Sequence, residues 1–292
     1  MRLGIVPIFE AQGLSDIILS EKGLDLSKFN YIELVDRAYN MGFRHIEITS
    51  DLMYVIPNSI TEDTIDKLNI IKDEKGVSFT VHLPIWSVEL ASPNSHIRRA
   101  SIDTTIEVIN FFEPLEPLNY VMHATGALAS EFTRLKVPPL MKQAINKYMQ
   151  SFAIKSLEEI ISKTEINPRK IAIENVEFPF ELTREMVDKF DTSICYDTGH
   201  LLSGMSGRYD PIEFLRTNYD RIVEIHLHDG YERVENNNRR IWADHLALGD
   251  GDLPFCELLF LLKEKGFKGP VVFEMGIEKV IKSIQILKEK CK

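Results

Sequence analysis

The chain has 292 residues, of which 44% are hydrophobic and 27% are charged, an ordinary balance for a globular protein of this length. Its net charge of −10 argues against a general polyanion binder, because neutralising phosphates requires clustered Lys and Arg. No apolar run approaches the ~20 residues needed to cross a bilayer, so neither a membrane span nor a leader at Met1 is expected.

Short apolar runs along the chain are predicted to be strands. They are too short and too apolar to be half exposed, which is typical of parallel strands buried on both faces. Pro84 ends the third run, because proline cannot donate a ladder hydrogen bond. The eight runs are Leu3–Ile8, His45–Thr49, Val77–Leu83, Asn119–His123, Lys170–Glu174, Ser193–Tyr196, Arg221–His226 and Pro270–Glu274.

Helical spacing of apolar residues predicts helices between and after these runs. Gly42, Gly76 and Gly266 follow three of them and are typical helix stops. Strands that alternate with helices in this way imply parallel pairing with right-handed crossovers. The eight predicted helices are Phe29–Met41, Ile60–Lys75, His96–Phe112, Pro139–Ser162, Thr183–Phe190, Pro211–Asn218, Phe255–Lys265 and Ile277–Lys290.

This alternation favours a single (β/α)8 TIM barrel over residues 1–292 rather than an open, doubly wound sheet. The glycine-rich first turn of a dinucleotide-binding fold is missing, because Gly4 and Gly13 form no phosphate cradle. The glycine cluster at residues 249–251 carries a carboxylate where a phosphate would bind. In a barrel, the carboxyl ends of all strands meet on one face, where active sites are built.

Six of the predicted strands carry an imidazole or a carboxylate at or next to their last residue, with no Lys or Arg among these six residues. They are His82, His123, Glu174, Asp197, His226 and Glu274. Buried carboxylates without partners are costly, and a divalent ion would supply the partner. The mixture of nitrogen and oxygen donors suits Zn, Mn, Fe or Co better than Ca. A lone histidine is more often a hydrogen-bonded core residue, but six such residues at strand ends favour a metal centre.

Other residues near these runs have competing interpretations. Asp197, taken alone, is more often a helix cap. His45 begins a strand and His96 starts a helix, so both are expected to be structural. His228 follows the seventh strand and is expected to support the centre by contacting a ligand rather than the ion. His245, in the predicted loop over residues 243–251, is either within reach of the centre or exposed to solvent.

The number and spacing of the cysteines indicate in which cellular compartment the protein is expected. Cys195, Cys256 and Cys291 are far apart in the sequence, odd in number and without the spacing of a metal site. Because disulfides are rare in the cytosol, this usage favours a reduced, cytoplasmic setting. The sequence leaves the oligomeric state open.

Motifs within residues 78–276 resemble the xylose isomerase-like barrel superfamily, on its endonuclease IV (AP endonuclease family 2) side. They are His82-Leu83-Pro84 with Glu89-Leu90-Ala91-Ser92, His123-Ala124-Thr125-Gly126, Glu174-Asn175, Asp197-Thr198-Gly199-His200, His226-Leu227-His228-Asp229, the stretch from His245 to Gly251, and Glu274. The resemblance implies a three-metal cluster built from nine side chains. Eight have counterparts here, namely His82, His123, Glu174, Asp197, His200, His226, His245 and Glu274.

The ninth side chain, an aspartate two residues before His245, is Ala243 in this chain. A methyl group binds no metal, so the third ion should be held by His200 and His245 and bind more loosely than the other two. Asp244 is the alternative donor, if its carboxylate turns inward rather than toward solvent.

The resemblance leaves two chemistries in competition, because the superfamily contains phosphoester hydrolases and sugar isomerases. In the hydrolase interpretation, Glu174 bridges two ions at a phosphoryl group, and Glu174, Glu274 and His200 are the expected catalytic residues. In the isomerase interpretation, one ion is bound by Glu174, Asp197, His226 and Glu274, and the two glutamates move a proton between carbons. His82 and His123 favour hydrolysis. A metal-stabilised binding barrel without activity is the least favoured interpretation.

The expected substrate is a small phosphoester or phosphodiester, such as a sugar phosphate, a nucleotide-like ester or the nucleotide loop of a corrinoid. Abasic DNA is less favoured, because the loop over residues 51–58 carries no Arg. In addition, Ile85 stands where the DNA-cleaving relatives carry an aromatic residue. The expected cofactors are divalent ions, Zn first, with Mn, Fe or Co as alternatives.

Overall fold

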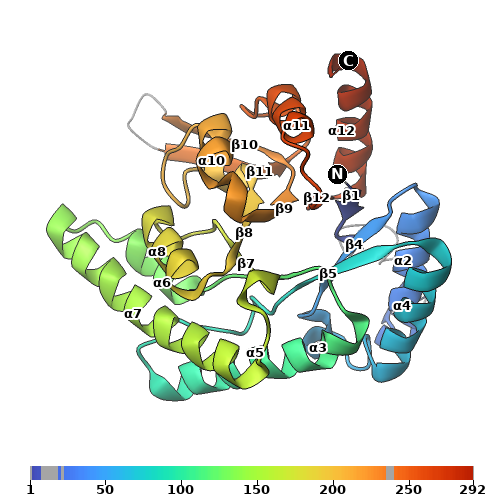
Figure 1. The fold of residues 1–292 in the computed structure, drawn as a ribbon, viewed down its shortest axis with the longest axis horizontal. Coiled ribbons are helices and arrows are strands. Elements are labelled where there is room, and N and C mark those ends of the chain that lie inside the picture. The colour runs from blue at the N-terminus through green and yellow to red at the C-terminus, as the bar shows by residue number, and fades with distance from the viewer. Residues whose placement is uncertain (1, 8–18, 21–22, 235–239, 292) are drawn as a thin grey trace.

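The computed structural model describes residues 2–7, 19–20, 23–234 and 240–291, within which eight parallel strands close into a barrel (Figure 1). Around the ring the order is β1, β12, β9, β8, β7, β6, β5 and β4, and β1 pairs with β4 to close it. The barrel strands are β1 (Arg2–Ile5), β4 (His45–Thr49), β5 (Ser78–His82), β6 (Tyr120–Met122), β7 (Ile171–Glu174), β8 (Ser193–Asp197), β9 (Ile222–His226) and β12 (Pro270–Phe273).

Each predicted strand overlaps one barrel strand, which confirms the (β/α)8 TIM barrel. Ile8, the last residue of the first predicted strand, lies outside the described residues. Helices surround the ring of strands in Figure 1. They are α2 (Tyr31–Asn40), α4 (Glu62–Lys75), α5 (Ser95–Phe112), α7 (Pro139–Thr164), α8 (Phe180–Phe190), α10 (Pro211–Asn218), α11 (Phe255–Glu264) and α12 (Ile277–Lys290).

Helix ends follow local capping chemistry. The Thr61 hydroxyl accepts the backbone N–H of Thr64 at the start of α4, and Gly76 ends the helix with a left-handed φ of 65°. Asp210 caps α10 in the same way. The start of α8 was predicted too late, because Pro179 rather than a polar cap precedes it. Shorter helices follow three strands, namely α3 (Leu52–Val55), α6 (Ala127–Thr133) and α9 (Thr198–Leu202).

The main hydrophobic core fills the space between the strands and the surrounding helices. The barrel interior is different. Alternate residues of a strand face inward, and at such positions Val121, Ala172 and Cys195 form a small apolar cluster that is separate from the main core. Polar side chains fill much of the remaining interior, including the buried Glu47 and Glu224.

A hairpin of β10 (Asp229–Val234) and β11 (Arg240–Leu246) follows β9, in a sheet separate from the barrel. His245 therefore lies in a strand and not in the predicted loop. The loop prediction was wrong because this strand is charged and partly exposed, unlike the apolar barrel strands. The Asp229 carboxylate accepts N–H groups from Gly230, Gly249 and Leu253, which ties the hairpin to the segment after it. A second short ribbon pairs β2 (Leu19–Ser20) with β3 (Gly23–Leu24).

Two of the cysteines form a disulfide. The expectation that the cysteines are reduced, which was drawn from their separation in the sequence, was therefore wrong. Cys256 on α11 and Cys291 after α12 have Cα atoms 5.2 Å apart, although 35 positions separate them in the sequence. Cys195 is free and buried inside the barrel. Cysteine usage thus no longer supports a cytoplasmic setting. Within the described part of the chain, no helix has both the length and the apolar character needed to span a membrane.

Candidate metal centre

All eight predicted metal ligands lie at or beyond the carboxyl ends of the barrel strands. His82, Glu174, Asp197 and His226 are the last residues of their strands, and Glu274 directly follows β12. The remaining three come from a strand end, a short helix and the hairpin, namely His123, His200 and His245. The parallel ring thus gathers side chains from positions far apart in sequence, as predicted. Their role as ligands stays a prediction.

Glu174 lies at the middle of the cluster. Its Oε2 atom is 3.4 Å from His82 Nε2 and 3.1 Å from His123 Nε2. Its Oε1 atom is 2.8 Å from His200 Nδ1. One buried carboxylate therefore contacts three imidazoles, and its two oxygens face different parts of the cluster.

Asp197 has two roles at the start of α9. Its Oδ1 atom accepts the backbone N–H of His200 at 2.6 Å, so the helix-cap interpretation is correct. Its Oδ2 atom lies 2.8 Å from His228 Nε2 and 3.6 Å from His226 Nδ1, inside the cluster. Because His228 Nδ1 accepts the backbone N–H of His245, its Nε2 carries the proton that it donates to Asp197. His228 thus supports the cluster from behind.

Four side chains form a compact group that we call the tetrad: Glu174, Asp197, His226 and Glu274. One donor atom from each lies within 4.8 Å of all the others. Within the described chain, His226 Nδ1 and Glu274 Oε2 are buried without a hydrogen-bond partner, although they lie 2.8 Å apart. Such unpaired buried atoms are rare, and a divalent ion among the four donors would satisfy them. One nitrogen and three carboxylates fit Zn, Mn, Fe or Co.

The charges of the cluster perturb one another strongly. Burial would raise the pKa of Glu174 and Asp197, but the neighbouring imidazoles hold both well below their ordinary values. Burial would lower the pKa of His82 and His200, but the carboxylates raise them to about 9 and about 10. Without an ion, the imidazoles therefore keep protons that balance the carboxylates, and a bound cation would displace them.

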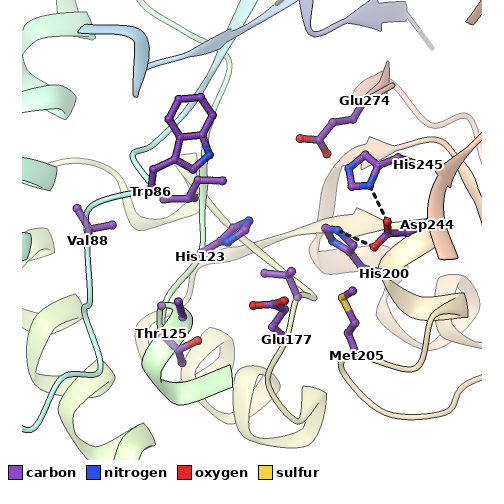
Figure 2. Close-up of a pocket in the computed structure, with 14 residues that line it drawn as sticks. Trp86, Val88, His123, Thr125, Glu177, His200, Met205, Asp244, His245 and Glu274 are labelled. Atoms are coloured by element: carbon purple, nitrogen blue, oxygen red, sulfur yellow. Dashed lines mark hydrogen bonds and ion pairs between the residues drawn. The ribbon is translucent and has the colours of Figure 1, made fainter. Parts of the chain in front are cut away.

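Asp244 turns its carboxylate inward, toward the place where the family aspartate is missing. Its Oδ1 atom lies 3.0 Å from His245 Nδ1 and its Oδ2 atom 3.8 Å from His200 Nε2 (Figure 2). Neighbouring residues of a strand normally face opposite sides, but His245 has a left-handed φ of 49°, which lets both side chains face His200. The Asp244 side chain is only 17% exposed, so the solvent-facing alternative was wrong.

A pocket of about 430 Å³ opens directly over these residues. Its polar wall includes His123, His200, Asp244, His245 and Glu274. Trp86 lies on the opposite side (Figure 2), where the carboxylate of Asp51 accepts the backbone N–H groups of Ile85 and Trp86 and holds this segment in place. The volume suits a small molecule or part of a larger one.

Sequence reasoning missed a deeper partner of the cluster, Glu47 on β4. Its Oε2 atom lies 3.2 Å from His226 Nε2, and burial raises its pKa to about 7. The available signal was a glutamate between Ile46 and Ile48, in the middle of an apolar strand. The structural interpretation of His45 agrees with its contacts, because this buried imidazole hydrogen-bonds the hydroxyls of Ser78 and Thr80. His96 is exposed near the start of α5.

Comparison with known proteins relates the chain to one family of barrel proteins. The family model for xylose isomerase-like TIM barrels matches residues 35–290. The uncharacterized protein MJ1311 of Methanocaldococcus jannaschii is 25% identical over 236 residues, which cover 75% of this chain and 72% of that protein.

Solved structures with the same fold include two kinds of enzyme. A D-tagatose 3-epimerase-like protein aligns over 99% of this chain and 96% of its own, with a TM-score of 0.68 and 22% identity. Endonuclease IV from Thermus thermophilus aligns over 99% and 98%, with a TM-score of 0.65 and 15% identity. D-psicose 3-epimerase from Clostridium cellulolyticum aligns over 95% and 86%, with a TM-score of 0.65 and 18% identity. At these identities the likeness shows the fold alone.

Proposed function

Because the chain belongs to the xylose isomerase-like TIM barrel family, as its motifs predicted, we propose that it is a metal-dependent hydrolase of a small phosphoester or phosphodiester. The observation that carries this proposal is the convergence of His82 and His123 on Glu174 Oε2. A site for one ion is complete without these two imidazoles. Additional donors beside a shared carboxylate are what closely spaced ions at a phosphoryl group require.

Three adjoining groups of donors would hold the ions. His82, His123 and Glu174 form the first group, and the tetrad forms the second. His200, His245 and the inward-facing Asp244 form the third. When bound, closely spaced divalent ions supply Lewis-acid activation of a phosphoryl group and of water, and Zn is the favoured ion, with Mn, Fe or Co as alternatives.

The side chains of the pocket supply positioning and proton transfer. Glu274 lines the pocket beside His226, so its carboxylate is the group placed to accept a proton from an attacking water. His200 lines the same wall and is held by Glu174, so it is placed beside a reacting oxygen. The exposed indole of Trp86, with Ile85 and Val88, forms an apolar surface on the opposite side of the pocket.

A sugar or sugar-phosphate isomerase or epimerase is the second candidate. The tetrad on its own is a complete group of four donors, and two of the compared structures are named as epimerases. In this alternative, Glu174 and Glu274 would transfer a proton between substrate carbons. His82 and His123 would then be dispensable.

Abasic DNA remains the less favoured substrate. The described residues that line the pocket include no Lys or Arg, and the chain carries a net charge of −10. A DNA-cleaving site would need positive side chains around the centre to hold the phosphate backbone. The pocket of about 430 Å³ matches a small ester better.

A substrate panel tests the proposal. Purified protein reconstituted with Zn²⁺ or Mn²⁺ would be assayed with bis(p-nitrophenyl) phosphate, sugar phosphates, nucleotides, abasic duplex DNA and ketoses. We expect turnover of small phosphoesters that a chelator abolishes and added ion restores. Ketose epimerisation without phosphoester turnover would instead support the second candidate.

A further inference from the structure

A layer of buried polar side chains lies inside the barrel, below the tetrad. We call this the inner layer; it consists of His45, Glu47, Thr80 and Glu224, all fully buried. Strand geometry explains the arrangement. Glu47 pairs with Thr80 in the register of β4 and β5, and Glu224 lies two positions before His226 on β9 and so faces the same side.

His226 connects the inner layer with the tetrad. On one side of its ring, Nδ1 lies 2.8 Å from Glu274 Oε2. On the other side, Nε2 lies 3.2 Å from Glu47 Oε2. A neutral imidazole has one protonated and one unprotonated nitrogen, and only the unprotonated nitrogen can bind an ion. The partner of Nε2 therefore decides whether Nδ1 is available.

The rest of the inner layer leaves Glu47 to pair with His226. The Thr80 hydroxyl has a single proton, and it donates to Glu224 Oε1 at 3.0 Å, a shorter distance than the 3.4 Å to Glu47 Oε2. His45 Nε2, 3.0 Å from the same hydroxyl, then donates to it. The chain of donors thus runs from His45 through Thr80 to Glu224. Glu47 Oε2 receives its hydrogen bond from the remaining donor, His226 Nε2.

We propose that Glu47 is a positioning residue of the metal centre: it accepts the Nε2–H of His226 and thereby makes Nδ1, which faces the tetrad, the nitrogen that gives up its proton when an ion binds. Outer carboxylates of this kind fix the tautomer and orientation of a metal-binding imidazole and raise its basicity. The inference rests on the metal centre of the proposed function, but it does not depend on which reaction that centre catalyses.

Three variants separate this role from simple packing. Glu47→Leu keeps a similar side-chain size and removes the acceptor. Glu47→Gln keeps an acceptor oxygen and removes the charge. Glu224→Gln is the matched control, because it removes the charge of the other buried glutamate of the layer, which pairs with Thr80 rather than with His226. Circular dichroism and thermal unfolding show whether each variant folds. If Glu47→Leu does not fold, Glu47→Gln alone provides the test.

Ion affinity and the protonation of His226 are the two readouts. Competition between each ion-free variant and a chromophoric chelator measures Zn²⁺ affinity. NMR of the Zn²⁺-loaded, ¹⁵N-histidine-labelled protein reports which nitrogen of His226 carries the proton. We expect Glu47→Leu to weaken the tightest ion by about 10- to 100-fold and to alter the ring signals of His226. Glu47→Gln should have a smaller effect in the same direction, and Glu224→Gln should leave both readouts close to wild type.

Several results would overturn the inference. One is unchanged affinity and unchanged ring signals in folded Glu47→Leu. Another is an equal loss in Glu47→Leu and Glu224→Gln, which would make the effect a general property of the inner layer. A lower ion count in Glu47→Gln, with unchanged affinity for the rest, would make Glu47 a ligand of its own. Wild-type protein that binds ions but turns over no phosphoester would remove the proposed function and leave this inference standing.

Discussion

Two groups of side chains make up the candidate metal centre, and the barrel strands bring them together in different ways. The tetrad comes from four consecutive positions around the ring, β7, β8, β9 and β12, and its donor atoms lie within 4.8 Å of one another. His82 and His123 come from β5 and β6, and they reach the centre through a single oxygen of Glu174. In the proposed metal centre, the tetrad would hold an ion by itself, whereas the two imidazoles would serve as ligands only to a further ion.

In the proposed metal centre, holding an ion and selecting a reaction are therefore separable properties of the barrel. The epimerases and the endonuclease that share the fold show that one arrangement of strands serves both kinds of enzyme. In this chain, changes in the tetrad should affect every activity, whereas changes on β5 and β6 should discriminate between hydrolysis and isomerisation.

The largest loss of ion binding and activity is expected when a residue of the tetrad is replaced. Asp197→Ala should remove ion binding and activity while the barrel stays folded, because the side chain lies at a strand end. We expect the fall in ion affinity to exceed the roughly 100-fold fall caused by replacing a residue that only supports a ligand. Elemental analysis and activity assays measure it.

Asp197→Asn serves as the control for the helix cap, because it keeps an acceptor for the His200 N–H and removes the charge. It should also lose the ion, although the cost of about 1 kcal/mol for a missing cap is avoided. If Asp197→Ala mainly unfolds the chain, or if Asp197→Asn keeps its ions, the site is structural.

The second-largest effect, a loss of phosphoester turnover, is expected when His82 or His123 is replaced. His82→Ala and His123→Ala should each abolish phosphoester turnover, because they remove donors beside the shared Glu174 carboxylate, while the tetrad keeps its ion. His96→Ala, a change at an exposed imidazole on α5, should behave as wild type. Ketose epimerisation retained in both variants would reverse the order of the two candidate functions.

Acid should weaken ion binding. Without an ion, the neighbouring carboxylates raise the pKa of His82 to about 9 and that of His200 to about 10, so both imidazoles are protonated at pH 7. An ion must displace these protons, and its affinity should therefore rise by up to about tenfold per pH unit for each proton released until the pH passes these values. Chelator competition at pH 6.5 and 7.5 measures the slope. A slope of zero would show that the imidazoles stay out of the ion-binding equilibrium.

The smallest effect concerns the third group of donors. Asp244→Ala should weaken the loosest ion by about tenfold, and Ala243→Asp should tighten it by a similar factor. Stepwise chelation followed by elemental analysis orders the ions by affinity. Asp250→Ala, at a carboxylate that pairs with Lys282 on the surface, is the matched control. Three equally tight ions in wild type, with no change in Asp244→Ala, would contradict the role given to Asp244.

The barrel and most of the candidate site could be predicted because parallel barrel strands leave two clear signals in the sequence. They are apolar on both faces, so the strand from Ser193 to Asp197 stands out from its neighbours, and their carboxyl ends meet on one face. A polar residue at the end of such a run, such as Glu174, therefore belongs to the site by topology alone.

The features that the sequence analysis missed or left open depend on contacts that cross the structure. Glu47 lies within a strand rather than at its end, and its partner His226 is 179 positions away. The inward turn of Asp244 depends on the left-handed backbone of His245, which periodicity does not reveal. The pairing of Cys256 with Cys291 depends on how two helices pack. None of these relations leaves a repeating pattern along the chain.

The hairpin that carries Asp244 and His245 has a consequence for how such a protein can diversify. It forms its own sheet and contributes no strand to the closed ring. Exchanging or shortening β10 and β11 would therefore leave the barrel strands that carry the tetrad in place, and among the tetrad it would affect Asp197, through the His245 N–H that orients His228. Descendants of one ancestral barrel could gain or lose an ion through this appendage alone, so inheritance of the fold and inheritance of the number of ions need not go together.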